Sequence, residues 1–136
     1  MAAPVVTKAL RDTSVIIDAT GLDAWRGIEP LISSVTLGEL HAGVEQGDAM
    51  ERATRRRRLL YVASTHRVLS YGADEAEAFG LLWRMVTELG RKPRSRALDL
   101  QIAATAMVHD LPLLTRNYRD LEGLERAVRV VPIGAE

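Results

Sequence analysis

Residues 11–17 read Arg-Asp-Thr-Ser-Val-Ile-Ile and carry one acid between two apolar stretches. The preceding residues, Val5 to Leu10, are rich in β-formers and predict a short strand. Thr13 or Ser14 could cap a helix from about Val15 to Ala19. The chain therefore begins with a strand, a break and a helix, and Asp12 lies directly after the strand.

Two more segments place an acid in an apolar setting. They are residues 35–40, Val-Thr-Leu-Gly-Glu-Leu, and residues 99–106, Asp-Leu-Gln-Ile-Ala-Ala-Thr-Ala. An ionised carboxylate among core residues is costly unless it is paired or holds a metal. Asp12, Glu39 and Asp99 together predict a carboxylate cluster that holds a hard divalent cation.

Size and composition favour one globular domain over residues 1–136. Hydrophobic residues make up 47% of the chain, which argues against disorder, and the absence of cysteine excludes disulfides, thiolate zinc sites and a cysteine nucleophile. No apolar run approaches the ~20 residues that span a bilayer. Met1 to Lys8 lacks the pattern of a signal peptide. We therefore expect a soluble cytoplasmic protein with no membrane partner.

The formal net charge is zero, from 18 basic and 18 acidic residues, which weakly opposes a passive nucleic-acid binder. The basic residues form two blocks. One is Arg52 with Arg55–Arg58, and the other is Arg91, Lys92, Arg94 and Arg96. Beside an acidic pocket, such blocks suit an enzyme that grips phosphates. The alternative is solvated surface, since four consecutive arginines splay around a helical turn.

The rest of the chain alternates strand and helix candidates. Strands are expected at Pro30–Ser33, Arg67–Leu69, Leu113–Thr115 and Val128–Ile133. Helices are expected over Thr36–Glu45 with Ser34 as N-cap, from Asp48 to about Leu60, from Asp74 to Leu89, and over Ala97–His109. This alternation favours an α/β/α sandwich with a central, mainly parallel sheet flanked by helices.

Helical spacing also predicts which side chains face the core. In the helix that ends before Gly90, they are Phe79, Leu82, Val86 and Leu89. In the Ala97–His109 helix, they are Leu98, Ile102, Thr105 and Ala106.

In open parallel sheets, sites form beyond the carboxyl ends of the strands. Asp12 follows the first strand and Asn117 follows the Leu113–Thr115 strand. Glu39 and Asp99 lie near the first turns of their helices. The four side chains could therefore meet at one edge of the sheet.

Each acid also has a purely structural interpretation. Asp12 could end its strand and cap the next helix, Glu39 could face solvent, and Asp99 could complement its helix dipole. No P-loop or G-x-S-x-G motif is present. The histidines are scattered, with His41 expected at the surface and His109 at a helix end.

Four segments resemble the motifs of PIN-domain ribonucleases. Residues 11–17 resemble the opening D-T-[SN]-V-[IL] motif, residues 34–40 the second motif, and residues 99–106 the D-x-x-I-A-A-T-A motif. Residues 114–121, Leu-Thr-Arg-Asn-Tyr-Arg-Asp-Leu, resemble the closing T-[RD]-[ND]-x-x-D-F segment. The motifs occur in family order along nearly the whole chain. In its motifs and its length, the chain most resembles the VapC toxins of bacterial type II toxin–antitoxin systems.

The resemblance implies that Asp12, Glu39 and Asp99 are the acids of a Mg²⁺ site. Asn117 lies where many members carry a fourth acid, and Asp120 could substitute for it. Two further departures are Arg11, where an apolar residue is usual, and Leu121, where phenylalanine is usual. The family also implies a homodimer or a hetero-oligomer with an antitoxin, whose tail fills the groove and often places an arginine against the acids.

The hypothesis is therefore an endoribonuclease that depends on Mg²⁺, with Mn²⁺ as a possible substitute. Asp12 and Asp99 would hold the metal, and Glu39 would complete its shell or orient the attacking water. Thr13 and Thr115 could hydrogen-bond ligands or phosphate, and Arg94 and Arg96 could steer the RNA.

Two other classes remain open. The first is an inactive PIN-like module that only binds a partner protein or RNA. The second is a response-regulator-like domain, which needs a lysine on a late loop. That class is disfavoured because the lysines of this chain are Lys8 and Lys92.

Overall fold

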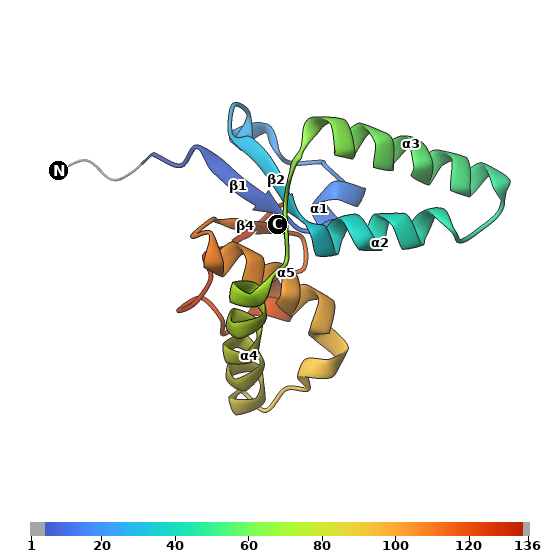
Figure 1. Cartoon of the computed structure of the whole chain (residues 1–136). Coiled ribbons are helices and arrows are strands. Elements are labelled where there is room, and N and C mark those ends of the chain that lie inside the picture. Colours follow the sequence, from blue (N-terminus) through green and yellow to red (C-terminus); the bar gives the residue numbers. More distant parts are fainter. Residues whose placement is uncertain (1–4, 135–136) are drawn as a thin grey trace.

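The computed structural model describes residues 5–134, and its centre is a five-stranded sheet in the order β3-β2-β1-β4-β5 (Figure 1). The strands are β1 (Lys8–Arg11), β2 (Glu29–Ser33), β3 (Arg67–Leu69), β4 (Leu113–Thr115) and β5 (Val130–Pro132). All neighbouring strands pair in parallel. Because the first strand lies in the middle, its carboxyl end is flanked by those of β2 and β4.

Helices cover both faces of the sheet. They are α1 (Thr13–Ile17), α2 (Ser34–Val44), α3 (Ala49–Thr65), α4 (Ala73–Glu88) and α5 (Ala97–Val108), with short 3₁₀ turns η1 (Asp23–Trp25), η2 (Pro93–Arg96) and η3 (Tyr118–Leu121). In Figure 1 the α2–α3 hairpin extends to one side, whereas α4 and α5 lie together on the other. The predicted α/β/α sandwich is confirmed.

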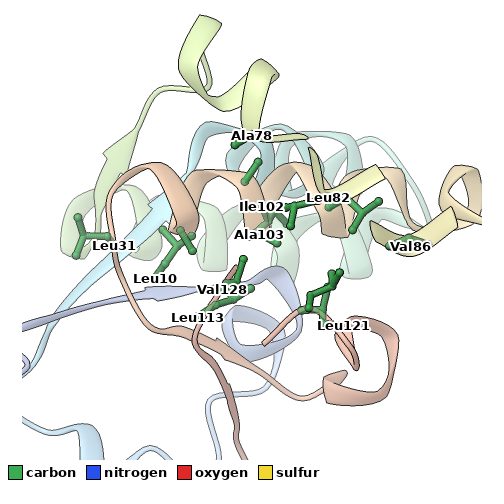
Figure 2. Close-up of a cluster of buried hydrophobic side chains, with 14 residues drawn as sticks. Leu10, Leu31, Ala78, Leu82, Val86, Ile102, Ala103, Leu113, Leu121 and Val128 are labelled. Carbon is green, nitrogen blue, oxygen red and sulfur yellow. The ribbon is translucent and has the colours of Figure 1, made fainter. Parts of the chain in front are cut away.

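Neighbouring residues of β2 point to opposite faces of the sheet, as the strand period requires. Leu31 joins the larger core, which Leu10, Leu82 and Ile102 fill between the sheet and the α4–α5 pair (Figure 2). Ile32 joins a second core beneath the α2–α3 hairpin; its other buried members are Ile16, Leu40, Val44, Leu59 and Val62. The two cores hold the helix layers against the sheet from either side.

The N-caps of α1 and α2 lie earlier than the sequence indicated. Asp12, rather than Thr13 or Ser14, caps α1, and its side chain accepts a hydrogen bond from Val15 N. Ser33, rather than Ser34, caps α2 and accepts from Val35 N. In both places several consecutive residues have suitable side chains, and the last residue with extended backbone becomes the cap. One consequence is that the Asp12 carboxylate is held by its own helix.

The other helices also differ in detail from the prediction. Asp48 caps α3 as predicted, but that helix continues to Thr65 rather than ending near Leu60. Helix α4 begins after Gly72, not at Asp74. Leu89 and Leu98 were expected to face the core but are about half exposed, because each lies at the end of its helix, where the adjoining chain does not cover it. Within residues 5–134, no helix is both long and apolar enough to cross a membrane.

Candidate active site

Asp12 lies at the carboxyl end of the central strand and is 5% exposed. Its backbone N donates to Leu114 O on β4 at 3.1 Å. Its Oδ1 atom accepts from Val15 N at 3.2 Å and from Ser14 Oγ at 2.5 Å. Such donors offset the loss of hydration that a carboxylate suffers on burial. The first turn of α1 therefore both stabilises and orients this acid.

Ser14 connects the Asp12 carboxylate to the segment after β4. Its Oγ accepts from Arg116 N at 3.0 Å. The Arg116 side chain in turn donates to Asp18 O at 2.8 Å and to the Thr20 carbonyl. Sequence reasoning proposed Ser14 only as a helix cap and did not consider Arg116. The signal for Ser14 was its position two residues after the motif acid, where its hydroxyl reaches back to that acid.

Glu39 lies on α2 and is held by a residue of α1. Thr13 Oγ1 donates to Glu39 Oε1 at 2.6 Å and also lies 3.2 Å from Thr36 Oγ1. Thr36 is fully buried, so it anchors the threonine pair to the protein interior. The hydrogen bond fixes one carboxylate oxygen of Glu39, and Oε2 has no such partner within residues 5–134. Thr36 was not among the predicted site residues.

Asp99 occupies the first turn of α5, where its negative charge complements the helix dipole. Burial is nevertheless the largest influence on this group, and it raises the pKa of Asp99 to about 6. The negative charges of three neighbouring carboxylates act in the same direction, and these belong to Asp12, Asp120 and Glu39. The predicted acids therefore lie close enough to repel one another at one edge of the sheet.

Asp120 contributes a negative charge to this cluster. Asp120 lies on η3, and its Oδ1 is 3.9 Å from Arg96 Nη2. The Arg96 charge also lowers the pKa of Asp99, opposing the carboxylates. Asn117 is exposed, and its backbone N donates to Thr115 Oγ1 at 2.9 Å. Asp120 on η3 is thus the fourth carboxylate of the group around Asp99, and its role in a metal site stays a prediction.

The donor set suits a hard cation. Its groups are carboxylates, and the chain has no thiolate to attract a softer metal. Within residues 5–134, no group of three or more His, Cys, Asp or Glu side chains is placed to hold a metal ion together. Mg²⁺ usually keeps several water ligands and needs one or two carboxylates, so a complete protein cage is not required.

The remaining predicted residues have mixed surroundings. Thr115 is fully buried, and Arg94 is exposed. Arg91 donates to Glu122 O at 2.9 Å and ties η3 to the loop before η2. His41 is exposed, as expected. RNA contacts by Thr13, Thr115, Arg94 and Arg96 stay predictions.

A cavity of about 670 Å³ lies away from these acids, at the amino ends of β1 and β5. Its lining includes Lys8, Asp110 and Arg129. In open parallel sheets, functional sites form at the carboxyl ends of the strands, so the acid cluster is the better candidate for catalysis.

The PIN-domain family model matches residues 9–127. The chain belongs to the PIN-domain family. Among curated relatives, it is 43% identical over 119 residues to Ribonuclease VapC4 of Mycobacterium tuberculosis (strain ATCC 25618 / H37Rv), covering 82% of this chain and 88% of the relative. It is 29% identical over 130 residues to Ribonuclease VapC of Rickettsia bellii (strain RML369-C), covering 90% and 95%. The resemblance to PIN-domain ribonucleases of the VapC group is confirmed.

Solved structures of VapBC toxin–antitoxin proteins share this fold. VapBC-5 from M. tuberculosis, a member of the VapBC family of toxin–antitoxin systems, matches with a TM-score of 0.77 and 32% identity over 95% of this chain and 99% of that one. VapBC-1 from nontypeable Haemophilus influenzae matches with a TM-score of 0.76 over 92% and 97% of the two chains. At 18% identity, the second likeness concerns the fold alone.

Proposed function

We propose that this PIN-domain protein is a Mg²⁺-dependent endoribonuclease and the toxin of a type II toxin–antitoxin pair. It would hydrolyse RNA phosphodiester bonds in the cytoplasm, as a single domain over residues 1–136. The observation that carries the proposal is the convergence of carboxylates around Asp99, whose pKa they help to raise. Family membership supports the choice of RNA, since the curated relatives are named ribonucleases.

In this proposal Asp12 and Asp99 hold the cation, because they project from the central strand and the facing helix. When bound, Mg²⁺ lowers the pKa of a water ligand and offsets negative charge on the phosphate, and Mn²⁺ could replace it. Glu39 keeps one oxygen on Thr13 and uses the other to complete the shell or orient water. Ser14 holds the Asp12 carboxylate in place, and Thr13 holds that of Glu39.

Asp120 is the fourth acid of the proposed site, in place of Asn117. Its ion pair with Arg96 neutralises part of its charge. We therefore propose that one cation is held firmly and that a second would require Asp120 to leave Arg96.

The proposed partners are a cognate antitoxin and an RNA substrate. Solved relatives are VapBC toxin–antitoxin complexes, and one from Rickettsia felis is bound to a DNA fragment from their promoter. By analogy, we propose that this chain forms a homodimer or a hetero-oligomer with its antitoxin.

The experiment is RNA cleavage with matched variants. Purified wild type is incubated with total RNA in Mg²⁺ or in EDTA, beside Asp99→Asn and Asp110→Asn. Asp110 follows α5 at its far end and lines the distant cavity, so it is a control for the same chemical change. Cleavage should require Mg²⁺, persist in Asp110→Asn and fall at least about 100-fold in Asp99→Asn, because one preorganised charged group contributes about that much.

Cleavage that survives EDTA or Asp99→Asn would contradict the metal–carboxylate mechanism. If wild type cleaves nothing but binds its antitoxin tightly, the chain is an inactive binding module.

A further inference from the structure

Arg11, the departure from the first motif, is a half-buried cation at the carboxyl end of β1. Within residues 5–134 it forms no ion pair with an acid. Its polar contact joins Nη1 to His66 Nε2 at 3.3 Å, at the C-cap of α3. Burial lowers the pKa of Arg11, although a guanidinium keeps its charge at neutral pH. Arg11 directly precedes Asp12 in the chain, but the extended backbone turns the two side chains to opposite faces of the sheet, so Arg11 faces α3.

A chain of hydrogen bonds orients this cation. A guanidinium can only donate, so His66 Nε2 must accept and the imidazole proton must be on Nδ1. Nδ1 then donates to Thr65 Oγ1, 2.9 Å away, and the Thr65 hydroxyl donates to Tyr61 O at 2.7 Å. Burial, followed by the Arg11 charge, lowers the pKa of His66, which agrees with a neutral ring.

Tyr61 brings an aromatic ring to the same place. It lies one helical turn before Thr65 on α3 and is 65% exposed. Aromatic residues make up only 4% of the chain, so an exposed ring beside a cation is a distinctive surface. The Tyr61 phenol also lies near enough to Arg11 to raise the pKa of Arg11, which opposes the larger, lowering effect of burial.

The Arg11 guanidinium keeps donors for a ligand. It has five N–H groups, and one contact with His66 uses only part of them. Within residues 5–134 no buried side-chain nitrogen or oxygen lacks a partner, so the unused donors of Arg11 reach solvent. Arginine donors match phosphate oxygens in a paired geometry.

We propose that Arg11, His66 and Tyr61 form an RNA-binding subsite where the carboxyl end of β1 meets the C-terminal turn of α3. Arg11 contacts a backbone phosphate, Tyr61 stacks on a neighbouring unpaired base, and His66 is a positioning residue for Arg11. This proposal rests on the proposed ribonuclease function. A ring that stacks on bases and a cation that binds phosphate suit single-stranded RNA better than an acidic peptide.

The charge balance explains why such a subsite is needed. RNA is a polyanion, and the cluster around Asp99 presents four carboxylates. Two of the nearby basic side chains already have partners within the protein, since Arg96 pairs with Asp120 and Arg91 donates to Glu122 O, just after η3. Arg11 forms no ion pair with an acid within residues 5–134, so its charge stays available for a phosphate of the RNA.

The test measures binding of a labelled single-stranded RNA oligonucleotide to the full chain in EDTA, by fluorescence anisotropy over a series of salt concentrations. Arg11→Gln should weaken binding about 5- to 10-fold and reduce the slope of log K against log salt by about 0.7, because one phosphate contact is lost. Arg11→Lys should retain the slope. Arg129→Gln, an exposed arginine at the opposite edge of the sheet, is the matched control.

Tyr61 and His66 variants separate stacking from charge. Tyr61→Ala should weaken binding about tenfold without changing the salt slope, and Tyr61→Phe should bind like wild type. His66→Ala should lower both affinity and slope, whereas His66→Gln should restore them, since its amide oxygen can accept from Arg11. Thermal unfolding checks that each variant is folded. Because Tyr61 is exposed, its variants test the subsite even if Arg11→Gln does not fold.

The proposal is overturned if Arg11→Gln and Tyr61→Ala bind RNA as tightly as the Arg129→Gln control. It is also overturned if these variants lose antitoxin binding but keep RNA binding, since the surface would then be a protein interface. Binding in EDTA does not depend on cleavage. A protein that binds through Arg11 but never cleaves would refute the proposed nuclease, whereas one that cleaves without using Arg11 would refute the subsite.

Discussion

Asp99 is the residue whose charge should most affect stability. Its pKa is about 6 in the folded protein and 3.8 as a free side chain. As the pH rises from about 4 to 6, the unfolded chain loses its proton first, so the folded state becomes less stable. Above about 6, folding carries the full cost of the buried charge. The opposite pattern, a gain in stability with rising pH, is usual for a paired carboxylate.

We therefore predict that Asp99→Asn stabilises the protein in EDTA. The group is partly exposed, so the gain at pH 7.5 should be on the order of 1 kcal/mol, or about 2–4 °C in Tm. At pH 4 the two proteins should unfold at similar temperatures. Thermal unfolding followed by circular dichroism across this range measures the difference, and Asp110→Asn controls for the change of residue type. A variant that is less stable than wild type at pH 7.5 would contradict the prediction.

Ser14 should matter for both the stability and the activity of the protein. Ser14→Ala removes a donor to Asp12 and an acceptor for Arg116 N. Two lost hydrogen bonds in a partly buried setting should lower the free energy of unfolding by about 1–2 kcal/mol, and cleavage should slow because Asp12 loses its orientation. Urea unfolding and RNA cleavage measure the two effects. Ser95→Ala is the control, since Ser95 is exposed and should change stability by less than about 0.5 kcal/mol.

At the level of elements, a contact between buried Glu75 and His109 joins α4 to the end of α5. Glu75 is 6% exposed, accepts from Gly72 N at 2.8 Å, and lies 3.3 Å from His109 Nε2. Burial opposes ionisation of Glu75, but the hydrogen bond from Gly72 and the neighbouring His109 outweigh it, so the pKa of Glu75 is lowered. Sequence reasoning placed His109 at a helix end but did not identify Glu75 as its partner.

Glu75→Gln should destabilise the protein by about 1 kcal/mol at neutral pH, since it replaces the charged acceptor of Gly72 N by a weaker neutral one. The stability that Glu75 supplies is present above its unfolded pKa, near 4.5, and is lost as the pH falls through the lower folded value. The difference from wild type should therefore shrink below about pH 4. Urea titrations at several pH values test this. Glu77→Gln, on the exposed side of the same helix, should have almost no effect.

The element boundaries show what the sequence could and could not predict. All five strands and the parallel arrangement were predictable, because short apolar runs alternate with longer helical patterns. The caps at Asp12 and Ser33 were missed by one or two residues, since neighbouring side chains are chemically equivalent as caps. The exposure of Leu89 and Leu98 could not be predicted from helical spacing, which does not reveal where tertiary cover ends.

For the candidate site, the acids could be named from the sequence because each lies in a motif. The contacts that support these acids could not be predicted from the sequence. The Ser14–Arg116 and Arg11–His66 pairs join residues far apart in the sequence, so only the folded chain shows them.

At the level of the whole molecule, metal binding should appear as added stability. A ligand that binds only the folded state stabilises it by about 1.4 kcal/mol at ten times its Kd. Mg²⁺ should therefore raise the Tm of wild type by roughly 3–5 °C at that concentration. Asp12→Asn should lose this response, and Asp110→Asn should keep it. An equal rise in all three proteins would indicate a general salt effect instead of binding at the carboxylates.

The sheet order has a consequence for how the protein is made. Strand β1 is central, and Leu10 pairs with Leu113, so this contact closes a loop containing most of the chain. Until α5 and β4 have been synthesised, Asp12 lacks both the acid on α5 and its β4 neighbour. The order of the strands thus delays assembly of the carboxylate group until β4 can pair with β1.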